Sequence, residues 1–383
     1  MSDGELAEAK RYGRLELHCT LADKFIDLAY LSIAALLLAK PLDAWLHSAP
    51  TLADNWTLRL AAMFLIVTAL HVAASFPLSF YSGHWMEHKF QLSTQTFGQW
   101  LWRYAKRILL STALSLVVVI GLYWLIWSLG WAWWLAAAGA FFVVSIVLGK
   151  LAPVLILPLF YKIEKLDAPE LSARIARLAE GTGMSIEGVY RMNLSEETVK
   201  ANAMLAGSGR TRRVLLGDTL LAGFGPDEIE VIFAHEIGHH VYHHIGKITA
   251  FGLLFSAIGF AACDRILWAW VSRGGGGGGI DYDRFPVYAL PLVLLILTLM
   301  AMLFEPLQNA LTRHFERQAD RYALERTGLN DAYRSAFRKL AKLNKDDPSP
   351  HWLDVLLFHS HPPVEERLAM ADRVVRQSAG GNQ

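Results

Sequence analysis

The sequence predicts a mostly α-helical, polytopic membrane protein with about six transmembrane helices and one inserted small α/β domain. Of its 383 residues, 54% are hydrophobic and only 19% are charged, whereas about 25% are charged in a typical soluble domain. The hydrophobic residues also gather into blocks long enough to cross a bilayer, which takes roughly 20 mostly apolar residues. Between two of these blocks lies a long polar stretch with the mixed pattern of an α/β unit.

Six blocks qualify as membrane spans. The first is the least regular, because Asp27, Lys40 and Pro41 interrupt it, and a buried or interfacial helix is the alternative there. The six blocks cover about residues 25–46, 60–81, 108–130, 132–160, 248–272 and 286–307.

The basic residues of short loops predict the orientation. Residues 82–107 carry four Lys or Arg residues, whereas 47–59 carry one and the connection near 131 carries none. Because basic loops stay on the cytoplasmic side, we expect loop 82–107 and both termini in the cytoplasm. The polar segments 161–247 and 308–383 are separated by an even number of spans, so they emerge on that same face.

The spans divide the chain into four parts. The expected parts are a four-span membrane region at 1–160, a domain with candidate catalytic residues at 161–247, two further transmembrane helices at 248–307 and a C-terminal helical part at 308–383 that completes this catalytic domain. Six consecutive glycines at 274–279 are expected to form a flexible connector in the outer loop.

Charge and cysteine content exclude several classes of protein. The formal net charge of +1 excludes a globally basic nucleic-acid binder, so no nucleic-acid partner is expected. Residues 1–24 mix acidic and basic side chains and do not resemble a cleaved signal. Cys19 and Cys263 set no disulfide framework, and Cys263 lies inside an apolar block.

Segment 161–247 predicts a small sheet between helices. A helix is expected to start at Asp167 as cap with Pro169 in its first turn, and to stop at Gly181. A later helix opens at Gly225 and Pro226 and continues to about residue 245. The expected strands are 188–194, 198–205 and 212–216, with a turn at 207–210 before the third.

The later helix carries the string HEIGH. His235 and His239 are four residues apart, so both imidazoles lie on one helix face and can bind one ion. Glu236 follows the first histidine and can contact water at the metal, which suits a general base. Catalytic zinc takes three protein ligands and leaves one position open. The pattern therefore predicts one Zn²⁺ per chain in a zincin-like metallopeptidase domain.

The third ligand is expected in the helix at 309–325. Glu316 is the preferred donor, and Asp320 lies one turn later, where it can accept a hydrogen bond from a ligating imidazole. A chance match of HExxH in a histidine-rich surface helix is the alternative for the whole site. The other candidate ligands are His240, His243, His244 and His314.

Several strings outside this site resemble the zinc-dependent CAAX prenyl endopeptidase family, membrane proteases that trim prenylated proteins. The most specific is EHKFQLSTQTFGQW at 87–100, which HExxH enzymes in general lack. The other similar strings are PLFYKIEKLDAPEL at 158–171, ANAMLAGSGRTRRVLLGDTLL at 201–221, NALTRHFERQAD at 309–320 and HSHPPVEERL at 359–368.

The resemblance implies roles for further residues. It places Asn202 and Ala203 along the bound substrate, and His361 and Arg367 near the scissile carbonyl as catalytic candidates. It also implies a peptide or protein substrate with a prenylated or strongly apolar C-terminal end, and the lipid bilayer as the second partner. A structural polar network is the alternative for His361 and Arg367, and a turn or strand end is the alternative for Asn202.

The chain departs from the family pattern in two ways. Arg103 stands in WLWRYAK where an acidic residue is expected, and six spans replace the seven of eukaryotic members. The competing function is a membrane zinc protease for quality control. A non-catalytic scaffold or channel, or a transporter suggested by His71 in the second span, is the alternative of another class.

Overall fold

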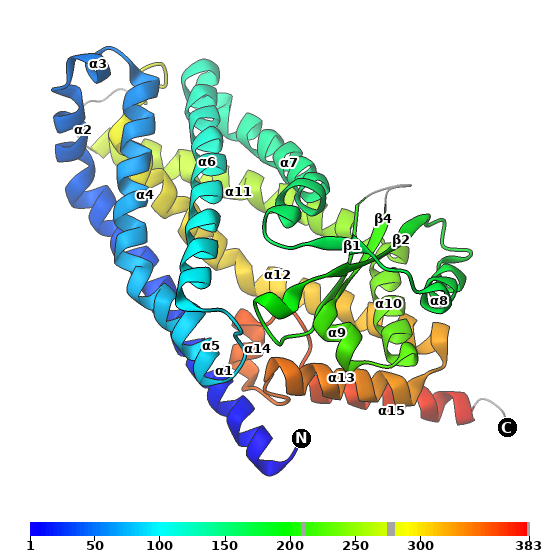
Figure 1. Cartoon of the computed structure of the whole chain (residues 1–383). Coiled ribbons are helices and arrows are strands. Elements are labelled where there is room, and N and C mark those ends of the chain that lie inside the picture. Colours follow the sequence, from blue (N-terminus) through cyan, green and yellow to red (C-terminus); the bar gives the residue numbers. More distant parts are fainter. Residues whose placement is uncertain (208–211, 274–279, 381–383) are drawn as a thin grey trace.

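The computed structural model describes residues 1–207, 212–273 and 280–380. The predicted glycine connector at 274–279 lies outside these described residues, as does most of the predicted turn at 207–210. The chain forms a group of long helices, which are joined to a smaller domain that contains the sheet (Figure 1).

Long helices make up the membrane part. In the described residues, five helical segments are long and apolar enough to span a bilayer, one fewer than the expected six. The difference arises because the segment Phe97–Leu159 holds two helices, which meet at Gly130 with a φ of 53° and turn back on each other (Figure 1). The long helices are α1 (Asp3–Ile33) continued by η1 (Ala34–Leu38) and α2 (Ala39–His47), α4 (Trp56–Phe80), α6 (Phe97–Leu129), α7 (Trp133–Leu151), α11 (His244–Arg273) and α12 (Leu290–Thr327).

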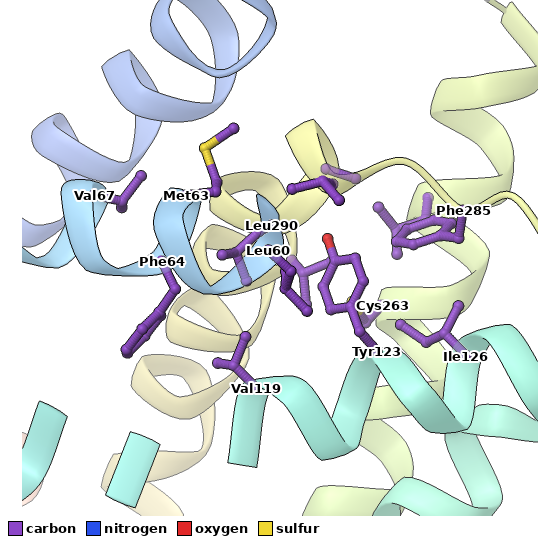
Figure 2. Packing of buried hydrophobic residues seen from close by; sticks show 14 of the residues in the cluster. Leu60, Met63, Phe64, Val67, Val119, Tyr123, Ile126, Cys263, Phe285 and Leu290 are labelled. Carbon is purple, nitrogen blue, oxygen red and sulfur yellow. The ribbon is translucent and has the colours of Figure 1, made fainter. Parts of the chain in front are cut away.

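A buried apolar cluster holds these helices together at the end away from the sheet. Side chains from α4, α6 and α11, with the start of α12, interdigitate around Tyr123 (Figure 2). Trp127 Nε1 also donates to the carbonyl of Phe285 at 3.0 Å, which ties α6 to the loop before α12. The labelled members in Figure 2 are Leu60, Met63, Phe64, Val67, Val119, Tyr123, Ile126, Cys263, Phe285 and Leu290.

The sheet has four strands in the order β1-β2-β4-β3, with β2 and β4 parallel and the outer pairs antiparallel. The predicted strand at 198–205 is wrong in its first half, because Thr198 and Val199 bond to Leu92 of the loop after α5 instead of to the sheet. Strand β1, at residues 163–165, is short and was not predicted from the sequence pattern. The strands are β1 (Ile163–Lys165), β2 (Ile186–Met192), β3 (Ala203–Ala206) and β4 (Arg212–Gly217).

Two predicted helix ends differ from the structure. Helix α8 (Pro169–Ala179) begins as expected at Pro169, but its cap is Ala168 rather than Asp167 and makes no side-chain bond. Helix α10 (Pro226–Val241) ends four residues before the expected position. The cause is His243, whose φ of 55° breaks the helix before α11 starts.

Most of the shorter helices lie around the sheet and the inner end of α12, whereas α3 connects α2 to α4 at the opposite end (Figure 1). Helix α12 runs without interruption from the membrane part into the domain that contains the sheet. The shorter helices are α3 (Pro50–Ala53), α5 (Glu87–Lys89), α9 (Asp218–Gly223), α13 (Asn330–Asn344), α14 (Trp352–Phe358) and α15 (Val364–Gly380).

Candidate active site

Helices α10 and α12 bring three expected metal ligands together. His235 Nε2 and His239 Nε2 are 3.1 Å apart, and each lies 3.3 Å from one carboxylate oxygen of Glu316. The three donor atoms all lie within 4.8 Å of one another. The i, i+4 spacing on α10 and the crossing of α12 thus place two imidazoles and one carboxylate around a single point.

This donor set fits a metal ion of the zinc type. Glu316 Oε2 is buried without a hydrogen-bond partner, and two imidazole nitrogens face each other across the same space. A buried carboxylate oxygen left in this state is costly unless a cation satisfies it. Two histidines with one glutamate form a ligand set that catalytic zinc takes.

Asp320 and Arg367 fix the orientation of His235 through its Nδ1 atom. His235 Nδ1 lies 2.9 Å from Asp320 Oδ1, while the guanidinium of Arg367 donates two hydrogen bonds to the same carboxylate and stacks 3.8 Å over the ring of Phe337. Burial alone would lower the pKa of His235, but the nearby carboxylates of Asp320 and Glu316 raise it to about 9. The arrangement fixes the imidazole so that Nε2 points to the ligand cluster.

His244 supports the second histidine, a contact that the sequence did not predict. Its Nδ1 lies 3.0 Å from Nδ1 of His239 and its Nε2 lies 2.9 Å from Oε1 of Gln318, while the ring stacks on Phe315. The predicted continuous helix to residue 245 hid this contact, because the break at His243 is what turns His244 toward His239.

The ligand cluster opens into a cavity of about 960 Å³. Glu236 lines it beside His235, and burial raises the pKa of the Glu236 carboxyl above its usual value. The other expected site residues that line the same cavity are Asn202, Ala203, Glu316, His361 and Arg367.

His361 and the edge strand face this cavity differently. His361 Nε2 lies 3.6 Å from Glu316 Oε1, and its side chain is 64% exposed, so it can reach a bound molecule. The carbonyl of Asn202 accepts from the amide of Gly217 at 2.9 Å, and Ala203 pairs with Leu216, which makes both part of the edge of the sheet.

Helix α5 joins the membrane helices to this edge. Glu87 accepts from the hydroxyl of Tyr12 at 2.6 Å and pairs with Lys200 at 3.1 Å, two residues before Asn202. Arg103, the departure noted in the sequence, donates to Glu197 at 2.9 Å. Sequence spacing could not predict the contacts of Tyr12 and Lys200 with Glu87, because these residues are distant from it in the sequence.

Gly238 lies where α10 crosses α12, so we expect Gly238→Ala to destabilise the protein. A Cβ there would lie 2.9 Å from the Cα of Ala319, which is backbone and cannot move aside. The expected loss is about 1 to 3 kcal/mol, with lower metal content because α10 moves away from Glu316. Thermal unfolding in detergent and metal analysis measure both effects.

Gly246→Ala is the matched control, because an added Cβ at this exposed glycine meets nothing within 4 Å. Equal unfolding temperatures for the two variants would contradict tight packing at the crossing.

Comparison with known families matches nearly the whole chain. Residues 165–375 match the model of peptidase family M48, and residues 1–162 match a model described as the CAAX prenyl protease N-terminal region with five membrane helices.

Individual relatives agree with these matches. A Bacillus subtilis protein described as the uncharacterized metalloprotease YhfN is 28% identical over 374 residues, covering 97% of this chain and 87% of the relative. CAAX prenyl protease 1 of Saccharomyces cerevisiae is 26% identical over 325 residues, covering 81% of this chain and 71% of the relative. The crystal structure of Ste24p from S. mikatae shares the fold, with a TM-score of 0.81 at 23% identity over 96% of this chain and 89% of that one.

Proposed function

Because the chain belongs to peptidase family M48 and is an integral, multi-pass membrane metalloprotease, we propose that His235, His239 and Glu316 hold one zinc ion and that Glu236 is the general base. The convergence of the three donors, two of which (His235 and Glu316) line the same cavity as Glu236, is the observation that carries this proposal. When bound, zinc supplies Lewis acidity that activates water and polarises a carbonyl.

Glu236 moves the protons of the reaction. Its carboxylate takes a proton from the attacking water and returns it to the nitrogen of the leaving peptide.

We propose that the substrate lies extended along β3. This strand is at the edge of the sheet, and Asn202 and Ala203 line the cavity at its start. Backbone hydrogen bonds to a sheet edge fix an extended peptide with little dependence on side chains. The buried guanidinium of Arg367 donates to Asp320, so Arg367 acts by positioning His235. The exposed imidazole of His361 stabilises the oxyanion.

The substrate that we propose is a protein with a prenylated or strongly apolar C-terminal end. Support comes from the relatives named CAAX prenyl proteases, from the match of residues 1–162 to their N-terminal region and from a cavity that reaches α1 and α12 of the membrane part. Each buried CH₂ of a lipid tail contributes about 0.8 kcal/mol, so an apolar anchor strengthens binding.

We expect the protein in liposomes to cut a farnesylated peptide ending in a CAAX sequence after the modified cysteine. Cleavage should stop with a zinc chelator and return with added Zn²⁺, and the unprenylated peptide should be cut less efficiently because it lacks the anchor. Mass spectrometry of the products measures the cleavage position.

Equal cleavage of both peptides, together with faster degradation of a misfolded membrane protein, would contradict the prenyl-substrate proposal. The quality-control protease would then be the better description, with the same metal chemistry.

We also propose that both termini and the active site face the cytoplasm. The basic loop 82–107 supports this orientation. The connections α2–α4 and α6–α7 and the segment before α12 also support it, because they lie at the end opposite the sheet (Figure 1).

Single cysteines at Asp331 and Asp54 test the orientation in a background without native cysteines. A membrane-impermeant maleimide should label the first only from the cytoplasmic side and the second only from the other side. Labelling of both from one side would contradict the proposed topology.

A further inference from the structure

One face of helix α14 lines the cavity, and the other face lies on the surface of the protein. Asp354 and Phe358 line the cavity. The outward face is apolar and exposed, and its most exposed member, Trp352, is 65% accessible. This apolar patch consists of Trp352, Leu353, Leu356 and Leu357.

The depth of α14 follows from its contacts with α12. The apolar run of α12 starts at Leu290, and about 20 helical residues at 1.5 Å each cross a hydrocarbon core of about 30 Å. The opposite edge of the core therefore lies near Asn309. Asn309 Nδ2 donates to the carbonyl of Leu357 at 2.8 Å, and Arg313 donates to that of Val355 at 2.6 Å. These bonds place α14 at the level of the lipid headgroups.

Helix α12 also carries an exposed apolar stripe on the membrane side of its contact with α14. Leu299, Leu303 and Leu307 recur every four residues on that helix and are all exposed. The stripe ends at Leu307, six residues before Arg313, where α14 packs against α12. A Trp and three Leu at interface depth are typical of an amphipathic helix that lies in the bilayer surface.

The inner face of α14 borders a polar part of the cavity wall. Glu305 of α12 lines the cavity and pairs with Lys24 of α1, whose ammonium lies 5.8 Å from the ring of Phe358. Helix α14 therefore separates the bilayer surface from the cavity.

We propose that α14 is an interfacial helix whose apolar patch lies among the lipids, and that a lipid-anchored substrate end enters the cavity past it. The second part rests on the proposed function, whereas the first part does not.

Spin labels test the depth in full-length protein in nanodiscs, with Cys19→Ser and Cys263→Ala as background. A label at Leu356 should collide with oxygen more often than with a water-soluble nickel complex, as a label at Leu303 does. The control is Asp331, whose side chain is fully exposed to water. Nickel accessibility at Leu356 equal to that at Asp331 would overturn the proposal.

The double variant Leu353→Glu, Leu356→Glu tests entry. Both side chains point outward, so the unfolding temperature should stay unchanged, while KM for the farnesylated peptide in liposomes rises about fivefold at unchanged kcat. KM for the unprenylated peptide should not change. An equal change for both peptides, or none for either, would overturn the role in entry, whereas failure of the wild type to cut the farnesylated peptide would contradict the proposed function and leave the depth result standing.

Discussion

Glu236→Gln is expected to lose nearly all turnover while it keeps about one zinc per chain. The change removes the proton acceptor but preserves the shape of the side chain and all three ligands, so kcat should fall by roughly 10² to 10⁴-fold. Zinc analysis of the purified protein and single-turnover cleavage of the farnesylated peptide measure the two quantities separately.

Glu230→Gln is the matched control on the same helix, because Glu230 pairs with Arg174 and does not line the cavity. Its activity should stay near that of the wild type. Loss of zinc in Glu236→Gln, or normal turnover, would contradict the role of general base.

Glu316→Ala is expected to lose both metal and activity. The buried carboxylate is the one anionic donor among the three ligands, so its removal should lower zinc affinity by more than about 100-fold. This loss is larger than the loss expected when a residue that only hydrogen-bonds to a ligand is changed. Equilibrium competition with a zinc chelator measures the affinity, and Glu316→Gln serves as a second variant of nearly the same shape.

Glu325→Ala is the control on α12, because this glutamate is exposed and lies outside the cavity. Full metal retention in both Glu316 variants would assign the third ligand to a neighbour such as His361, which lies 3.6 Å from the carboxylate.

The sequence predicted the parts of the site that depend on helix periodicity. The spacing of His235 and His239 places them on one face of α10, and an even number of spans puts Glu316 on the same side of the membrane. The membrane helices were also predictable, since block length and composition determine them. The family matches support the expected fold class and the metalloprotease function.

Contacts between distant segments could not be predicted in this way. The bond from His244 to His239 depends on a backbone break at His243, and the pairing of Thr198 with Leu92 removes half of an expected strand. The hydrogen bonds from Arg367 to Asp320 join two helices that are far apart in the chain. In each case tertiary packing overrides the local pattern.

X-ray absorption at the zinc edge of the purified, full-length protein tests the central claim most directly. We predict one zinc per chain with two imidazole nitrogens at about 2.0 to 2.1 Å and carboxylate or water oxygens at about 2.0 to 2.2 Å. At saturating zinc, the imidazole signal per bound zinc should halve in His239→Ala. A spectrum with sulfur or three imidazoles, or a protein that cleaves peptides without any bound metal, would contradict the site of His235, His239 and Glu316.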